Sequence, residues 1–277
     1  MKTAEILSSK ELMANLTLRE LRGKYKRSFM GWAWSLINPL AVMGIYTLVF
    51  SYFLKVKPDP GDPSGLQNFA FFLVCGLLPW NFLQNGMTGS MVALLGNANL
   101  IKKTYFPREI LVAATVASFD VSFLIELSVL AVALLAFGNF VLPWLLVVLG
   151  LVVIMTVFVM GIALMLSVLN VYFRDVQHLV GILLQLWFYA TPIVYPLRLV
   201  PTRFPSHGEF LGQVIPLRHI YSFNPMVRFA GVFRNALYDL RFPGATDVIY
   251  LLVVSIVTLA LGMAVFSALE PRLAEEL

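Results

Sequence analysis

The sequence predicts an all-α integral membrane protein. Of its 277 residues, 59% are hydrophobic and only 13% are charged, whereas about 45–50% of an ordinary soluble domain is apolar. Six apolar runs are long enough to cross a hydrocarbon core of about 30 Å, which takes roughly 20 helical residues. The runs lack the alternating pattern of membrane-barrel strands. Because a backbone in lipid must satisfy its own hydrogen bonds, each run is expected to be a helix.

The six predicted spans lie within a single transmembrane domain that covers residues 1–277. They are residues 31–54, 69–95, 110–137, 141–169, 179–196 and 247–269. The stretch before the first span lacks the basic segment and short apolar core of a cleaved signal peptide, so this span is expected to remain in the mature protein. The single cysteine, Cys75, lies in the second run, so no disulfide can form within the chain.

Residues 1–30 are expected to form an amphipathic helix at the cytoplasmic membrane interface. At 3.6 residues per turn, a narrow apolar stripe is formed by Leu7, Ala14, Leu18, Leu21 and Tyr25. Leu12 and Leu16 lie on the opposite side, so the amphipathicity is imperfect. Such a helix suits the level of the inner headgroups, where it would also contact a partner; a solvated basic anchor is the alternative.

The distribution of Lys and Arg predicts that both termini lie in the cytoplasm. With this orientation the cytoplasmic segments hold twelve basic residues, seven of them before the first span. The short outer loops hold only Lys55 and Lys57. Residues 197–246 are the exception, with six arginines, but long loops count little in this rule.

Residues 197–246 form the longest connection and are expected to be an extracytoplasmic gate segment. Prolines interrupt helices there, yet apolar residues recur at helical spacing at Met226, Phe229, Ala230, Phe233 and Leu237. We therefore expect short helices that enter the membrane partway or lie on its outer surface. The arginines Arg228 and Arg234 are expected to pair with anionic groups, to snorkel, or to hold the segment together.

The sequence contains no recognisable catalytic or metal-binding motif. The Gly-x-x-x-x-Gly-Lys-Ser/Thr loop of ATPases, the Gly-x-Ser-x-Gly elbow, His-Glu-x-x-His and Cys-x-x-Cys are all absent. The three histidines lack the spacing of metal ligands. We expect a protein that is not an enzyme, with no catalytic residue, metal or cofactor of its own.

Two acidic residues, Asp120 and Glu126, lie deep in the predicted third span. A charge at the centre of a span costs roughly 2.5–3.5 kcal/mol on insertion scales. Six residues of separation place the two about 120° apart around a helix, so they are not a paired dyad. One is expected to line a wet cavity and the other to bond to a neighbouring helix; structural hydrogen bonding of the neutral acids is the alternative.

Polar and aromatic residues form one stripe on the first predicted span and another on the fifth. They are Ser35, Asn38, Tyr46 and Phe53 on the first span, and Gln185, Phe188 and Tyr189 on the fifth. Aromatic rings can stack on the apolar faces of sugars, while amides and hydroxyls bond to their edges. These residues are expected to line a polar pore, with helix packing and interfacial aromatic belts as the alternative.

Several segments, in order along nearly the whole chain, resemble the polysaccharide and teichoic-acid export permeases, the membrane subunits of type-two ATP-binding-cassette exporters. The first is the run from Leu18 to Pro39. The others are Gly76-Leu-Leu-Pro-Trp80, Asn99-Leu-Ile-Lys-Lys103 with Phe106-Pro-Arg108, Tyr172-Phe-Arg-Asp175, Thr191-Pro-Ile-Val-Tyr-Pro196, and Asn224-Pro225 followed by Phe233-Arg234.

The resemblance implies a homodimeric permease in the bacterial plasma membrane, with two separate ATPase subunits that bind ATP and Mg²⁺ and with no nucleic-acid partner. In this family a coupling helix lies between the second and third spans. Here that is residues 97–109, where the ATPase would be faced by Asn99, Lys102, Lys103, Arg108 and Glu109. The implied cargo is an O-antigen or cell-wall type of polysaccharide linked to polyprenyl pyrophosphate. We expect its pyrophosphate to be recruited by Arg22, Lys24, Lys26 and Arg27; the alternative is that these cations only orient the chain.

The expected mechanism has the lipid-linked glycan enter from the inner leaflet and pass through a pore between two permeases, with residues 197–246 as its gate. Exporters of teichoic acid or another polyol phosphate, of drugs or of other lipids are alternatives of the same type. A membrane enzyme acting on polyprenyl phosphates would require clustered acids with a metal. A secondary transporter would require inverted repeats and ion sites at the midplane. The sequence shows neither pattern.

Overall fold

The computed structural model describes residues 10–25, 34–53, 58, 60–103, 106–195 and 221–276. Within these ranges the chain forms helices and turns and no strand, in agreement with the predicted class. Several residues of interest lie outside the described ranges, namely Leu7, Lys26, Arg27 and residues 197–220 of the gate segment.

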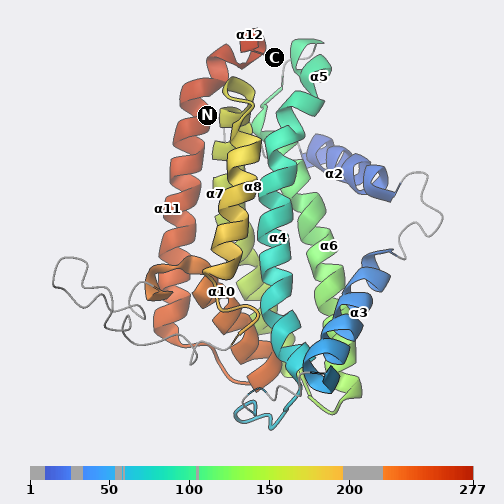
Figure 1. Cartoon of the computed structure of the whole chain (residues 1–277). Coiled ribbons are helices and arrows are strands. Elements are labelled where there is room, and N and C mark those ends of the chain that lie inside the picture. Colours follow the sequence, from blue (N-terminus) through green and yellow to red (C-terminus); the bar gives the residue numbers. More distant parts are fainter. Residues whose placement is uncertain are drawn as a thin grey trace, which may run out of the picture.

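The longest described helices lie side by side along one axis (Figure 1). They are α4 (Phe69–Gly96), α6 (Glu109–Ala136), α7 (Leu145–Tyr172, preceded by the 3₁₀ turn η3, Leu142–Trp144) and α11 (Ala245–Leu269). Three described stretches are long and apolar enough to cross a membrane: Glu109–Ala136, Leu142–Tyr172 and Ala245–Arg272. Each falls where the sequence predicts a span. α4 is equally long, with 28 residues, but polar residues interrupt its apolar run.

The first and fifth predicted spans correspond to shorter helices. In the first, α3 (Trp34–Tyr46) continues into the π-helical segment η2 (Thr47–Phe53). In the fifth, α8 (Val176–Tyr189) has 14 residues and ends at Tyr189, so the prediction of a helix extending to Pro196 is wrong. Pro192 explains the early end, because proline has no N–H to continue the ladder and disfavours helical backbone at the residue before it.

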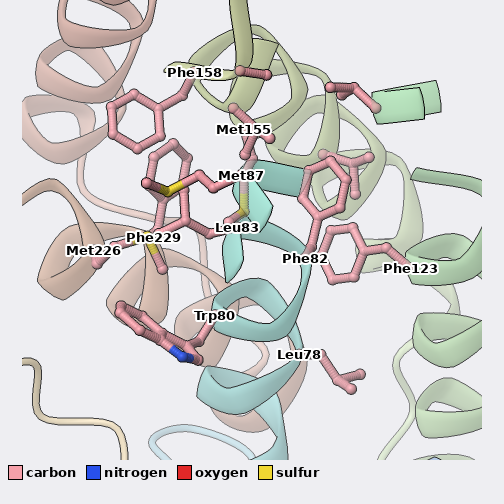
Figure 2. Close-up of a cluster of buried hydrophobic side chains, with 14 of the residues drawn as sticks. Leu78, Trp80, Phe82, Leu83, Met87, Phe123, Met155, Phe158, Met226 and Phe229 are labelled. Carbon is pink, nitrogen blue, oxygen red and sulfur yellow. The ribbon is translucent and has the colours of Figure 1, made fainter. Parts of the chain in front are cut away.

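α4 is the centre of the bundle, with 19 of its 28 residues buried. Figure 2 shows side chains from successive turns pointing towards different neighbours. Phe82 stacks on Phe123 of α6, with ring centroids 4.9 Å apart. Leu83 and Met87 point towards Phe229 of the gate segment. α4 therefore contacts most of the other helices, whereas α11 packs mainly on α7 and α2 packs on α6.

The described part of the gate segment contains α10 (Pro225–Arg234), which continues into η5 (Asn235–Asp239). The side chain of Asn224 caps this helix by accepting a hydrogen bond from the Met226 N–H, and Pro225 takes the first helical position. The predicted helical repeat is confirmed, since all five apolar residues from Met226 to Leu237 are buried. α10 packs against α4, α7 and α11.

At the end of the bundle opposite α10, short helices and helix ends contact one another (Figure 1). The short helix α5 (Ala98–Lys103) follows α4 and contacts the C-terminal helix α12 (Leu273–Glu276). Arg108, at the start of α6, donates a hydrogen bond to the carbonyl of Glu270 in the turn η6 (Glu270–Arg272), at 2.6 Å. The hydroxyl of Tyr172, at the end of α7, donates to the carbonyl of Leu269 at 2.8 Å.

The N-terminal helix α2 (Lys10–Tyr25) lies against α6. Its buried leucines are Leu16 and Leu21, which are 5% and 4% exposed, whereas Leu18 is 46% exposed. Ala14 is exposed too, so the face that packs on α6 includes Leu16 and Leu21, and Ala14 and Leu18 of the predicted stripe lie outside it. The contact with α6 decides which side of this weakly amphipathic helix is covered.

Candidate functional site

A groove of ≈ 380 Å³ lies between α4 and α8. Its α4 wall consists of Leu77, Trp80, Asn81 and Gln84, and its α8 wall of Gly181, Leu184, Gln185, Phe188 and Tyr189. The groove therefore contains all three pore residues predicted on the fifth span. Sequence reasoning missed the contribution of α4, although amide residues inside a long apolar run were the available signal.

The aromatic rings at the groove pack against one another. The Trp80 ring meets Trp187 edge-on, with centroids 5.8 Å apart, and lies 5.4 Å from the Phe188 ring. The Trp80 indole N–H donates to Oε1 of Gln84 at 3.1 Å. These contacts give the groove a rigid aromatic wall, because large rings in contact have few alternative rotamers.

The amides of the groove are available to a ligand. Asn81 and Gln185 have no hydrogen-bond partner among the described residues. The described lining contains no carboxylate, amine or imidazole. Amides supply both donors and acceptors, so the groove can bind hydroxyl-rich groups.

Tyr46 and Phe53, the predicted pore residues of the first span whose side chains the structure describes, do not line this groove. Tyr46 is half-buried and packs against the core, and Phe53 is 66% exposed. The side chains of Ser35 and Asn38 lie outside what the structure describes. α4 contacts α8 as well as α3 and η2, and it lies between them in Figure 1. The two predicted stripes therefore flank α4 within one chain.

Arg234 ties the gate segment to the bundle. Its guanidinium donates to the carbonyls of Phe72 at 3.1 Å, Pro192 at 2.9 Å and Ile193 at 2.6 Å. It also lies 3.9 Å from the centroid of the Phe72 ring. One side chain of α10 thus holds both α4 and the turn after α8.

Arg228 is also engaged within the chain. It donates to Oδ1 of Asp247, at the start of α11, and to the carbonyl of Ser222, both at 2.8 Å. Its guanidinium lies over the Tyr250 ring, 4.1 Å from the centroid. Both predicted arginines hold the described part of the gate segment in place.

Asn224 joins the end of α8 to the start of α10. Its Oδ1 accepts from the Trp187 indole N–H at 2.8 Å and from the Met226 N–H at 3.0 Å, and its amide nitrogen donates to the Thr191 hydroxyl at 3.1 Å. Trp187 packs in turn on Trp80. The groove wall and the gate segment are therefore parts of one connected network.

A family model described as ABC-2 type transporter matches residues 11–238. The chain belongs to the ABC-2 type transporter family. It is 30% identical over 274 residues to the O-antigen export system permease protein RfbA of Myxococcus xanthus, across 99% of this chain and 98% of that protein. A Klebsiella pneumoniae protein of the same name is 29% identical over 271 residues, across 96% and 94%. The polysialic acid transport protein KpsM of Escherichia coli is 23% identical over 265 residues, 92% of each chain.

These matches confirm the resemblance to type-two export permeases. The family is the membrane component of ABC-2 transporters, which work with ATP-binding subunits. Several residues of the segments that resemble this family also have structural roles in the fold. Gly76, Trp80, Thr191, Asn224 and Arg234 are the residues that join α4, α8 and α10.

The residues predicted to couple this ABC-2 permease to its ATPase divide into two groups. Asn99, Lys102 and Lys103 are exposed on α5, which is anchored by the buried Ile101. Arg108 is instead bonded to the Glu270 carbonyl, and the half-buried Glu109 is the first residue of α6. The exposed lysines are thus accessible, whereas Arg108 links two helices of the permease.

The predicted headgroup cluster is also divided. Arg22 is exposed and lines a hollow of ≈ 580 Å³ with Arg19, which the sequence analysis missed. Much of the Lys24 side chain is exposed, but its ammonium donates to the Ser118 carbonyl at 3.1 Å and lies 3.5 Å from the Phe119 ring centroid. This covering lowers the pKa of Lys24 to about 8, although the negative charges of Glu20 and Glu126 oppose the change.

The two intramembrane acids lie in different surroundings. Oδ1 of Asp120 accepts a hydrogen bond from the Thr156 hydroxyl of α7 at 2.9 Å. Glu126 is half-buried, and its charge interacts with that of Lys24. In the described part of the permease, no group of three or more His, Cys, Asp or Glu side chains could hold a metal ion.

Proposed function

We propose that the chain is the channel-forming permease of an ATP-driven exporter, and that it moves a polysaccharide linked to polyprenyl pyrophosphate across the bacterial plasma membrane. The groove between α4 and α8 carries this proposal, because it joins aromatic faces to unpartnered amides inside a membrane bundle. Relatives named for O-antigen export and polysialic acid transport support a glycan cargo.

The proposed assembly is a homodimer of six-span chains with two ATPase subunits. The first span comprises α3 and η2, and the fifth comprises α8 and the turn after it. The end that carries α5 and α12 faces the cytoplasm, since Lys102, Lys103, Arg174 and Arg272 are all exposed there. The described gate segment with α10 then lies on the outer side.

The ATPase subunit acts on the permease through α5. Lys102 and Lys103 meet the ATPase subunit, which binds ATP and Mg²⁺, and displacement of α5 reaches α6 through the chain. The bond from Arg108 to the Glu270 carbonyl passes the same displacement to α11. The connected network of Trp187, Asn224 and Arg234 carries the movement of α4 and α8 to the gate.

The cargo enters beside α2. Arg22, together with Lys26 and Arg27, attracts the pyrophosphate at the level of the inner headgroups. Arg19 lies beside Arg22, but its guanidinium donates to Oδ1 of Asn97 at 2.7 Å. Lys24 does not bind the pyrophosphate, because its ammonium already donates to α6 and positions α2 there. The glycan then passes Gln185, Phe188 and Tyr189, with Tyr46, Phe53, Ser35 and Asn38 on the flanking wall of the pore.

Reconstitution tests the proposal. The permease and its ATPase subunit are placed in vesicles whose outer leaflet carries a radiolabelled polyprenyl-pyrophosphate glycan. The amount of labelled glycan that reaches the vesicle interior is measured with and without ATP. Export is expected only with ATP, and only with both subunits. A permease with either Lys102→Glu or Lys103→Glu is expected to lose export while keeping its fold, whereas Lys10→Glu on α2 makes the same change of charge and serves as the control. Export of a lipid-linked polyol phosphate but not of the glycan would overturn the assignment of cargo.

A further inference from the structure

α4 exposes one polar stripe although it is the central helix of the bundle. The stripe consists of Asn81, Gln84, Asn85 and Thr88, of which Gln84 and Asn85 are exposed and the other two half-buried. At 3.6 residues per turn these four positions fall within about 100° of one another. Asn81 and Gln84 belong to the groove beside α8, and Asn85 and Thr88 continue the same face towards α5.

This stripe differs from the face that α11 exposes. The most exposed side chains of α11 are aliphatic, among them Val253, Ile256, Val257 and Leu261, as expected of a helix that faces lipid. A lipid-facing α4 would instead hold amides near the middle of a 28-residue helix. Burying an amide without a partner costs about 2–7 kcal/mol, so lipid is an unsuitable neighbour for this face.

The polar groups of the stripe are only partly satisfied within the chain. The Thr88 hydroxyl donates to the Gln84 carbonyl at 2.8 Å, and Oε1 of Gln84 accepts from Trp80. Among the described residues, the amides of Asn81 and Asn85 have no hydrogen-bond partner. Water or another molecule on this face can supply the partners that the described residues do not.

We propose that the α4 stripe is a wall of the conduit, where the hydroxyl groups of a glycan chain exchange hydrogen bonds with Asn81, Gln84 and Asn85. This inference rests on the proposed function and extends it to a helix that the sequence analysis did not place in the pore. Neutral amides suit a moving polymer, because each offers donors and acceptors without the strong attraction of a charge. Tyr189 of α8, which is 66% exposed, adds an aromatic face to the same groove.

Solvent accessibility tests the wall directly. In a Cys75→Ala background, single cysteines replace Gln84, Asn85 and Thr88, and a membrane-impermeant thiol reagent is applied to vesicles that contain the permease and its ATPase. Labelling is expected at all three positions and is expected to slow when glycan is present. Val253→Cys and Ile256→Cys on α11 are the matched controls and should stay unlabelled. Spontaneous disulfides between two copies would overturn the wall and place an interface there. No labelling on α4 would overturn it too, because the stripe would then not face water.

Transport by leucine variants gives a second measure. Gln84→Leu and Asn85→Leu are each expected to lower export about fivefold, since each loses roughly one hydrogen bond to the cargo. Val92→Leu is the control, because Val92 is exposed on the same side of α4 but apolar. Unchanged export in both amide variants would contradict the inference. If the wild-type vesicles export no glycan while the α4 cysteines still react, the cargo assignment fails and the water-lined wall stands.

Discussion

Gly76 of α4 leaves the space that the guanidinium of Arg234 occupies. A Cβ atom built on Gly76 would lie 2.8 Å from Nη2 of Arg234. That nitrogen donates to the Ile193 carbonyl, and the same guanidinium reaches Phe72 and Pro192. The absence of a side chain at one position of α4 therefore allows one cation of α10 to hold three segments together.

Replacing Gly76 with alanine is expected to loosen this junction. The added methyl group must displace a guanidinium that three carbonyls hold, so the free energy of unfolding should fall by about 1–3 kcal/mol. A fall in the melting temperature of the purified permease in detergent checks this. Gly231→Ala is the matched control, because no atom lies within 4 Å of a Cβ built there on α10. Equal melting temperatures for the two variants would count against the junction.

The contact between α7 and α11 depends on two other glycines. A Cβ on Gly161 would lie 2.4 Å from the Thr258 carbonyl carbon, and one on Gly262 would lie 2.1 Å from the Gly161 oxygen. Small residues allow membrane helices to approach this closely. Gly262→Ala is therefore expected to force the backbones apart and to lower the melting temperature more than Gly76→Ala does.

Gly262→Ala is expected to be the more destabilising change because a Cβ at Gly262 would meet backbone atoms, which cannot move aside. A Cβ at Gly76 would meet the end of a side chain. Gly150→Ala on α7 provides the control, since a Cβ there meets nothing within 4 Å. A Gly262→Ala permease as stable as the Gly150→Ala permease would show that the two helices are not in close contact.

Asn224 and Trp187 are expected to be energetically coupled. Asn224→Ala removes both the helix cap of α10 and the acceptor for the Trp187 indole, and loss of a cap alone costs about 0.5–2 kcal/mol. Trp187→Phe removes the indole donor and part of the ring that packs on Trp80. A double-mutant cycle on thermal or denaturant unfolding should give a coupling energy of about 0.5–3 kcal/mol. Additive effects of the two changes would contradict the network.

The docking of α2 on α6 is expected to tighten as the pH rises. The docked pKa of Lys24 is about 8, lowered from its ordinary value of 10.5 because α6 covers the ammonium. The undocked helix therefore binds more protons between these two values, so docking gains stability as the pH rises through this window. Below pH 8 the Lys24 ammonium is protonated whether or not α2 is docked, so docking must then cover a charged group.

Spin labels on cysteines at Asn15 of α2 and Ser128 of α6, in a Cys75→Ala background, report this docking through their distance distribution. The distribution should narrow between pH 7 and pH 9.5. Lys24→Met has no proton to lose, so its distribution should stay the same over that range. An equally strong pH response in the Lys24→Met variant would assign the effect to another group.

Most of the helices could be predicted from the sequence, because lipid imposes its requirement on each segment separately. The apolar runs of α6, α7 and α11 show this, since each is long and apolar in its own right. The end of α8 was misjudged because the residues after Tyr189 are apolar too, and Thr191 and Ile193 are buried among other helices rather than in lipid. The face of α2 that packs on α6, with Leu16 and Leu21, could not be predicted, because the contact depends on a helix about 100 residues away in the sequence.

The sequence by itself determined that this chain is a helical membrane protein, because composition and run length are local properties. Only the tertiary structure decided which polar residues are satisfied and which are available. Arg228 and Arg234 proved to be internal ties, and Asn81, Gln84 and Asn85 came to share the open side of a helix buried on its other faces. The physical reason is that a polar group's role depends on its neighbours in space, and those neighbours come from helices far apart in the chain.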